Sequence, residues 1–400
     1  MAACLEWFRK ERGWINEQHL KLCRIPAPTF FEQRRAEWMA EQFGLLGWRA
    51  EIDRAGNVIA RLDGADVPLV AVTAHLDTVL APRNPEEIRS LGDGRLEGPG
   101  VADNGAGLAA LLALAAAWKA HSHISGPFSG DEENDAAPVL IANVGEEGEG
   151  NLSGFRYLCQ QNQQQQPSAW KAFLVLDGPG VEHVTTRALA SRRFEIQMTG
   201  AGGHSWRDAE NANAVHGLSR AVTRFSDHMA TFPSAGVRHS FNFGIFDGGS
   251  SINSIPHEAW AKLDLRSENP LVLDEMEQLL VEAVEEAAAV ENRRKLGAPL
   301  TARVKEIGSR PGGELPNPSP LLDSLRAVDQ YLGIRSRTDC SSTDANIPLS
   351  LGIPAVSIGV GGQGGGAHST GEWYSAEGRE LGLRRVMLAW CLLLRNEGIR

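Results

Sequence analysis

Histidines and carboxylates follow apolar runs at five places in the sequence, and these residue types bind divalent metal ions in proteins. The apolar runs are typical of strands in an open α/β sheet, where ligands bind at the carboxyl ends of the strands. Side chains that follow different strands can therefore meet at one edge of the sheet. The candidates are His75 and Asp77 in VAVTAHLDTV, Asp103 in GPGVADNGAG, Glu146 and Glu147 in VGEEGEG, Asp177 in FLVLDGPG and His368 in GGQGGGAHSTGEW.

His75 and Asp77 are two residues apart, so in an extended chain both side chains point the same way. Asp77 can then orient His75 as a carboxylate behind the ring, although a histidine near an aspartate is also common on an exposed surface. Asp103 lies in a glycine-rich turn before an Ala/Leu helix. Either Asp103 or Asn104 could simply cap that helix, or the glycines could let the backbone approach a bound ion.

Glu146 and Glu147 are adjacent carboxylates, which repel each other unless a cation lies between or beside them. One of them can ligate a metal while the other accepts a proton from a water whose pKa the metal lowers. The alternative is a solvated acidic turn, which the nearby Glu149 also fits. For Asp177 the alternative is a turn that begins before Gly-Pro.

Together, two histidines and three carboxylates match what two divalent cations about 3.5 to 4 Å apart require, with one carboxylate bridging both. Sites with nitrogen and oxygen ligands accept zinc, cobalt or manganese with modest discrimination. The residues therefore predict a centre of two divalent metal ions and leave the choice among these metals open.

The elements that position these residues form an α/β layer. Three apolar runs predict buried parallel strands, and a helix-like stretch at Leu108–Lys119 separates the first two. The runs are Val67–Thr73, Pro138–Val144 and Trp170–Leu176, and a similar run, IPAVSIGV, comes late in the chain. The predicted fold is a mixed, mostly parallel sheet with helices on both faces.

Between Arg192 and about Arg310 the pattern changes to a β-α-β-β-α-β order, which is typical of a ferredoxin-like domain. The Pro- and Gly-rich stretch Arg310–Pro320 then resembles a linker that returns to the α/β layer. We therefore expect a catalytic domain in two pieces, residues 1–190 and 311–400, and an inserted lid at residues 191–310.

The composition excludes several classes of protein. The 400 residues are 42% hydrophobic and carry a net charge of −11, with no basic stripe for a nucleic acid. The five cysteines form no CxxC pair, which favours a reducing cytoplasm over a disulfide framework. The N-terminal segment reads as an amphipathic helix and not as a signal peptide, and the longest apolar run, Leu108–Trp118, is too short to cross a membrane. Ser125–Pro138 and Gln160–Ser168 are polar and are expected to be solvated loops.

The order HxD, D, EE, D, H, with a ferredoxin-like insertion before the last histidine, resembles the co-catalytic zinc metallopeptidases. This family includes carboxypeptidase G, peptidase T (tripeptidase), dipeptidase V and the succinyl-diaminopimelate and acetylornithine deacylases. The resemblance implies that His75 and Asp177 bind one metal, that Glu147 and His368 bind the other, and that Asp103 bridges them. It also implies that Asp77 orients His75 and that Glu146 is the general base.

The resemblance extends to the insertion. The Gly203-His204 pair matches a motif whose histidine polarises the scissile carbonyl, and Asn253 and Arg266 match substrate-binding positions. Arg266 could bind a substrate carboxylate through two hydrogen bonds, and His204 and Asn253 could donate to a developing oxyanion. The alternatives are that His204 is an ordinary turn residue, Asn253 an ordinary loop residue and Arg266 an ordinary surface residue. The resemblance implies a homodimer formed through the lid, in which His204 of each subunit reaches the active site of the other. Trp206 departs from the family, which has smaller residues after this histidine.

The function implied is hydrolysis of an amide bond in a short peptide, with a water that bridges two metals and a glutamate base. SSTDANIPLSLGIPAVSIG resembles the tripeptidase-like branch, which favours a peptidase. The alternatives are an N-acyl amino acid deacylase, acting on acetyl or succinyl compounds, and a non-catalytic metal-binding relative. No nucleic-acid or membrane partner is expected.

Overall fold

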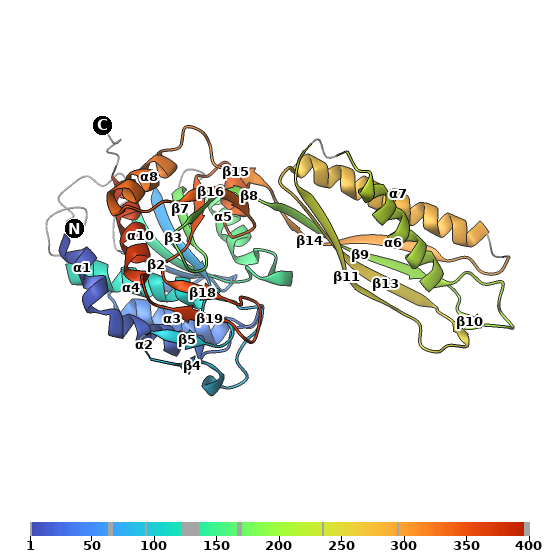
Figure 1. Ribbon diagram of the computed structural model, residues 1–400, viewed down its shortest axis with the longest axis horizontal. Coiled ribbons are helices and arrows are strands. Elements are labelled where there is room, and N and C mark those ends of the chain that lie inside the picture. Colours follow the sequence, from blue (N-terminus) through green and yellow to red (C-terminus); the bar gives the residue numbers. More distant parts are fainter. Residues whose placement is uncertain are drawn as a thin grey trace. The chain divides into compact units, whose positions relative to one another are not determined.

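The computed structural model describes residues 2–62, 67–92, 94–121, 136–165, 170–233, 236–293 and 296–395. The chain divides into two compact units (Figure 1). Unit 1 comprises residues 1–188 and 313–400, and unit 2 comprises residues 189–312. Unit 2 therefore begins and ends two residues outside the insertion expected at 191–310.

The centre of unit 1 is a parallel sheet. Its four central strands are buried along most of their length because their apolar side chains are covered on both faces. The predicted strands are present within a few residues of their expected bounds. In spatial order they are β6 (Ala137–Asn143), β3 (Leu69–His75), β7 (Trp170–Leu176) and β17 (Ala355–Ile358).

Further strands extend this sheet at both sides, and most of them pair antiparallel, so the sheet is mixed. Beyond β6 lie β2 (Val58–Arg61) and then β1 (Arg49–Ile52). Beyond β17 lies β8 (His183–Ala188), which pairs antiparallel with β15 (Gly313–Glu314) and parallel with β16 (Arg337–Ser341).

Helices cover both faces of the sheet. α4 (Gly105–His121) connects β3 to β6, and α5 (Ser153–Gln165) connects β6 to β7. The two connections run in opposite directions across the sheet, and since such connections are right-handed, α4 and α5 lie on opposite faces. Further helices of unit 1 are α1 (Ala2–Lys10), α2 (Arg12–Cys23), α3 (Gln33–Leu45), α8 (Pro320–Leu332), α9 (Asn346–Ser350) and α10 (Arg379–Leu394).

A small antiparallel sheet in unit 1 joins segments that are far apart in the sequence. It pairs two strands from before α4 with two strands from before α10. Their order is β18 (Gln363–Gly365), β19 (Trp373–Ser375), β5 (Arg95–Glu97) and β4 (Arg89–Ser90). The loop between β18 and β19 contains His368, so this sheet brings that histidine toward the segment that precedes α4.

One loop prediction is wrong. The glutamine-rich segment from Gln160 to Gln165 is the last part of α5, because glutamine is a good helix former and its polarity does not break a helix. The rest of that segment, residues 166–168, lies outside the described residues. The other predicted loop falls mostly outside them too, and its last two residues, Ala137 and Pro138, belong to β6.

Unit 2 has the expected β-α-β-β-α-β order around one antiparallel sheet. The strands pair in the order β11-β13-β9-β14, and two helices pack on each other and on β9 and β13. The elements are β9 (Ala190–Thr199), α6 (Ala214–Ala230), β11 (His239–Gly248), β13 (Glu258–Ser267), α7 (Pro270–Arg293) and β14 (Thr301–Arg310). A short ribbon, β10 (Gly203–His204) with β12 (Ser254–Ile255), completes the unit.

Two observations bear on the environment of the chain. None of its described helices combines the length and the apolar character that a membrane span requires. The cysteine side chains that the structure describes, Cys23, Cys159, Cys340 and Cys391, form no disulfide.

Candidate metal centre

The five predicted metal ligands come together in unit 1. They form two groups of three, and within each group the candidate ligand atoms lie within 4.8 Å of one another. One group is His75, Asp103 and Asp177, and the other is Asp103, Glu147 and His368. Asp103 belongs to both groups, which is the position that a bridging carboxylate requires. Their role as ligands stays a prediction, because the geometry shows proximity alone.

The parallel sheet explains why these residues meet. His75 is the last residue of β3, and Asp177 directly follows β7. Glu147 lies four residues after the end of β6, beyond a short turn at Gly145 (φ +66°). Since β6, β3 and β7 are parallel neighbours, their carboxyl ends lie at the same edge of the sheet.

The turn before α4 supplies Asp103. Asn104, and not Asp103, caps the helix, because its Oδ1 accepts a hydrogen bond from Gly107 N at 3.1 Å. The Nδ2 of Asn104 donates to the Leu176 carbonyl at 2.7 Å and ties the turn to β7. Gly100 in this turn has φ +75°, and a Cβ there would lie 2.4 Å from Cγ2 of Thr78. The Asp103 carboxylate therefore stays available for the two histidines.

Asp103 contacts both histidines with different oxygens. Its Oδ1 lies 3.0 Å from Nε2 of His75, and its Oδ2 lies 3.1 Å from Nε2 of His368. The same Nε2 of His368 lies 3.0 Å from Oε1 of Glu147. The two ring nitrogens therefore face carboxylate oxygens that could share a cation with them.

Asp77 organises the site from behind. Its carboxylate accepts hydrogen bonds from the main-chain amides of Glu146 (3.0 Å) and Glu147 (2.9 Å) and from the Thr29 hydroxyl (2.9 Å). Its Oδ1 lies 3.5 Å from Nδ1 of His75, and that nitrogen lies 3.0 Å from the Asp77 carbonyl oxygen. Asp77 thus contacts His75, as the sequence predicts, and it also fixes the backbone of both glutamates.

The crowding of carboxylates raises two pKa values. Desolvation and the negative charges of Glu146 and Asp103 raise the pKa of Glu147 to about 7. Desolvation and the charge of Asp103 raise the pKa of Asp177 to about 8. Both shifts have the same cause, which is that several carboxylates share a small volume shielded from water.

The pKa values of the two histidines are also raised, whereas that of the shared aspartate is lowered. Desolvation disfavours a charged His75 ring, but its hydrogen bonds to Asp103 and Asp77 raise its pKa well above the usual value. Hydrogen bonds to Asp103 and Glu147 raise the pKa of His368 to about 9. Although desolvation opposes it, the same contacts hold the pKa of Asp103 well below its usual range.

This donor set fits two divalent cations. It offers imidazole nitrogens and carboxylate oxygens, no thiolate, and one carboxylate placed between two groups. Without a cation, protons on the two rings and on Glu147 or Asp177 would relieve part of the charge conflict among the acids. Divalent cations bound to these atoms would replace those protons, so metal binding and proton release are coupled.

Glu146 lies beside the predicted ligands. It is buried, and it forms a third group with His75 and Glu147 in which the candidate atoms lie within 4.8 Å of one another. Its backbone is fixed by the bond to Asp77. A carboxylate held next to a metal centre in this way is placed to accept a proton from a water in that centre.

Two buried residues that sequence reasoning did not single out lie behind this edge of the sheet. Asn143 is the β6 residue paired with His75, and its Nδ2 donates to Oδ2 of Asp344 at 2.7 Å. Burial and the charge of Glu146 raise the pKa of Asp344 well above its usual value. The sequence carries a weak signal for both: Asn143 is a polar residue near the end of the apolar run PVLIANV, and Asp344 is an acid shortly before the apolar segment NIPLSLGIPAV.

The predicted substrate residues all lie in unit 2. His204 is exposed at the end of β10, and its Nδ1 lies 3.2 Å from Trp206 N and 3.4 Å from Arg207 N. Because both amides donate to Nδ1, the neutral ring carries its hydrogen on Nε2. Trp206, the departure from the family, is 87% exposed.

Asn253 and Arg266 have local partners. The main-chain carbonyl of Asn253 accepts a hydrogen bond from Ser205 N at 2.9 Å, and its side-chain Oδ1 accepts one from the Ser251 hydroxyl at 2.6 Å. Its side-chain amide group is therefore the part that could donate to a substrate. Nε of Arg266 donates to Oδ2 of Asp264 at 2.7 Å, on the same strand β13.

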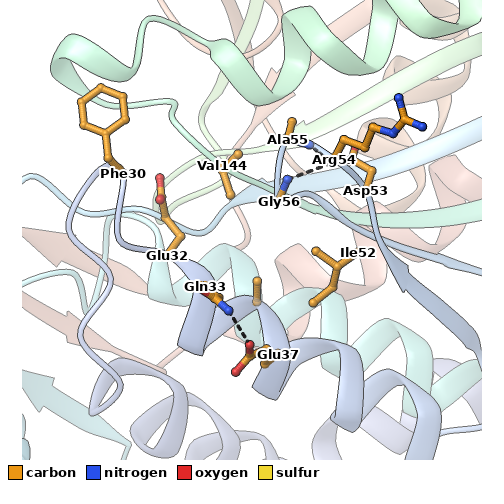
Figure 2. A pocket seen from close by; sticks show the side chains of 11 residues that line it. Phe30, Glu32, Gln33, Glu37, Ile52, Asp53, Arg54, Ala55, Gly56 and Val144 are labelled. Atoms are coloured by element: carbon orange, nitrogen blue, oxygen red, sulfur yellow. Dashed lines mark hydrogen bonds between the residues drawn. The ribbon is translucent and has the colours of Figure 1, made fainter.

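A separate concavity of about 340 Å³ lies between the start of α3 and the turn joining β1 to β2 (Figure 2). Phe30, Glu32 and Val144 line it, and none of the five predicted ligands does. Oε1 of Glu32 accepts a hydrogen bond from Gly145 N at 3.1 Å. This concavity therefore adjoins the turn that leads to Glu146, and it supplies no further ligand.

Comparisons with known proteins bear on the family and the fold of the chain. A model of peptidase family M20/M25/M40 matches residues 71–390. The uncharacterized protein YqjE of Bacillus subtilis (strain 168) is 24% identical over 362 residues, 87% of this chain and 90% of YqjE. A tripeptidase structure from Staphylococcus aureus subsp. aureus Mu50 is 20% identical, with a TM-score of 0.74 over 95% of this chain and 98% of that one. An amidase of the hydantoinase/carbamoylase family from Burkholderia vietnamiensis is 19% identical, with a TM-score of 0.67 over 94% and 93%.

Proposed function

We propose, because the chain belongs to peptidase family M20/M25/M40, that this hydrolase cleaves an amide bond in a short peptide at a centre of two divalent metal ions. The observation that carries the proposal is the pair of ligand groups that share Asp103, with the Glu146 carboxylate beside them. Neither a binding module nor a structural protein requires a buried carboxylate at that place.

The metal ions would be held by the five predicted ligands. His75 and Asp177 would hold one ion, Glu147 and His368 the other, and Asp103 both. When bound, such ions lower the pKa of a water and polarise the scissile carbonyl. Zinc is the proposed ion, and cobalt or manganese suits the same nitrogen and oxygen donors.

Glu146 would act as the general base. It takes a proton from the attacking water and then delivers that proton to the leaving amine, so one carboxylate serves both steps. Asp77 assists by holding the Glu146 backbone and by orienting His75. The geometry supports these roles because a hydrogen bond to Asp77 holds the Glu146 backbone and the Asp77 carboxylate contacts His75.

Unit 2 would supply the contacts to the substrate. The Nε2–H of His204 and the side-chain amide of Asn253 can donate to the oxygen that becomes negative during attack. Arg266 can hold a substrate carboxylate while it keeps its bond to Asp264 through Nε. A short peptide with a free carboxylate is the proposed substrate.

We further propose a homodimer formed through unit 2. Its support is β11, an edge strand of the four-stranded sheet that leaves Ile245 and Phe246 46% and 47% exposed. An edge strand with exposed apolar side chains can pair with a second copy. Light scattering coupled to size-exclusion chromatography tests this, and a monomer at micromolar concentration would contradict it.

A reducing cytoplasm is the proposed location, and it suits the four described cysteines, which form no disulfide.

The function is tested on purified protein with a substrate panel. Elemental analysis should find two divalent ions per chain, and di- and tripeptides should be hydrolysed faster than N-acetyl and N-succinyl amino acids. Turnover of acyl compounds alone would replace the peptide proposal with a deacylase. Two bound ions without any turnover would favour a non-catalytic relative.

A further inference from the structure

A buried carboxylate outside the ligand set holds the turn that contains Asp103. Glu372 is 2% exposed, and it accepts hydrogen bonds from three main-chain amides of this turn. Its Oε2 accepts from Gly100 N at 2.8 Å, and its Oε1 accepts from Ala102 N at 2.7 Å and Asp103 N at 2.8 Å. Amides that donate to a charged carboxylate form stronger bonds than amides that donate to a neutral group.

Glu372 also connects two of the predicted ligand segments. It lies four residues after His368, directly before β19. Its own carbonyl accepts from Gly98 N at 2.9 Å, so its main chain and side chain both bind the segment before Asp103. The loop that carries His368 and the turn that carries Asp103 therefore form one hydrogen-bonded assembly.

The opposite side of the turn is packed against α2. Nε2 of His19 lies 2.7 Å from the Val101 carbonyl, and a Cβ at Gly105 would lie 2.4 Å from Sγ of Cys23. The turn is thus held between α2 and the Glu372 carboxylate. Loss of the carboxylate would release one of these two sides.

The choice of a carboxylate at this place is costly for folding. Within the described part of the chain, no lysine or arginine forms an ion pair with Glu372, and burial raises its pKa although the three amides oppose this. A buried charge held by amides alone suits a role in which the turn must keep one shape.

We propose that Glu372 is a positioning residue that fixes Asp103 so that its two oxygens face both metal ions. The proposal rests on the metal centre of the proposed function. The three amide bonds set the backbone of residues 100–103, and this backbone sets where Oδ1 and Oδ2 of Asp103 point. Without these bonds, we expect Asp103 to bind one ion but not to bridge both.

The test uses two variants of the full chain and one control. Glu372→Gln keeps the shape but turns an NH₂ group toward one of the amide donors, and Glu372→Asp keeps the charge but is too short to reach all three. Glu291→Gln is the control, because Glu291 is equally buried and accepts from Asn213 N, but lies in unit 2. Each metal-free protein is titrated with Zn²⁺ by calorimetry, and its thermal midpoint is measured.

Both Glu372 variants should bind zinc about 10- to 100-fold more weakly than the wild type, the usual effect of losing a group that orients a metal ligand. The control should lower the thermal midpoint and leave zinc affinity unchanged. Affinity retained in both variants would overturn the proposal, and so would retention in Glu372→Asp alone, because then charge and not position matters. An equal loss in Glu291→Gln would also overturn it, since the effect would be general instability.

The same titration separates this proposal from the proposed function. A wild type that binds two zinc ions but hydrolyses no amide would contradict the function, whereas the comparison of affinities would still decide the role of Glu372. A wild type that binds no zinc would overturn both.

Discussion

Oδ2 of Asp103 lies 3.1 Å from Nε2 of His368, although the two residues are 265 positions apart in the chain. The contact joins the turn before α4 to the loop between β18 and β19. His368 adopts φ +63°, a left-handed conformation that is uncommon for a residue with a side chain. The tertiary structure therefore holds this ring against Asp103, where the two can share a cation.

Removal of metal by a chelator is expected to abolish amide hydrolysis and to leave the chain folded, because the apolar core of unit 1 does not depend on the ligands. Rebinding should raise the free energy of unfolding by about 2.7 kcal/mol for each ion, at a free metal concentration 100 times the Kd of its site. Circular dichroism and calorimetry measure both effects. Full turnover by protein whose metal loss had been verified by elemental analysis would contradict the metal mechanism.

Replacement of Glu146 by glutamine should lower kcat by about 10²- to 10⁴-fold, the usual contribution of a general base. Metal content should stay near that of the wild type, because Glu146 is not among the predicted ligands. Glu149→Gln is the matched control, since Glu149 is an exposed acid of the same loop. Normal turnover in Glu146→Gln would show that another group takes the proton.

Replacement of Asp77 by alanine removes the acceptor for two buried amides and the partner of His75. Metal affinity should fall by about 10- to 100-fold. Each amide left without a partner should also cost about 1–3 kcal/mol of stability. Thr29→Val removes one neutral bond to the same carboxylate and should have a smaller effect on both, as zinc titration and urea unfolding would report. Equal losses in the two variants would argue against a special role for Asp77.

Breaking a buried ion pair in unit 1 should cost more stability than breaking an exposed one. Arg385 is fully buried and binds Asp329 by two points, with both distances at 2.6 Å. Arg385→Ala leaves the Asp329 charge buried and should cost about 3–5 kcal/mol. Arg89→Ala breaks an exposed pair with Glu97 in the same unit and should cost at most about 1 kcal/mol. Urea unfolding compares them, and similar midpoints would show that the buried pair is unimportant.

Stability should depend on His19 at acid pH. Desolvation and the charge of Arg379 lower the pKa of this buried ring to about 3, whereas the same ring in the unfolded chain has a pKa near 6.5. Below the higher value the unfolded state binds one more proton than the folded state, so stability falls as the pH decreases, by up to about 1.4 kcal/mol per unit. His19→Gln removes this titrating group, so the free energy of unfolding of the variant should depend less steeply on pH between 3 and 6.5. Parallel profiles for the two proteins would show that His19 does not titrate in this way.

The sequence by itself determined the fold class and the residues that meet at the sheet edge. Apolar runs mark strands because a strand buried on both faces carries few polar groups, and the polar residue at or after the end of each run marks its carboxyl end. His75 and Asp177 are found by this rule alone. The β-α-β-β-α-β order of unit 2 is equally local, because helical and strand periods differ.

Only the tertiary structure decided which neighbouring polar residue does what. Asp103 and Asn104 look alike as helix caps, and the cap is Asn104 because its side chain also reaches Leu176 of β7. No sequence pattern marks Glu372 as a positioning residue, since the three amides that donate to it lie about 270 residues away along the chain. Hydrogen bonds between distant segments depend on where packing places two backbones, and residue types and spacing carry no record of that placement.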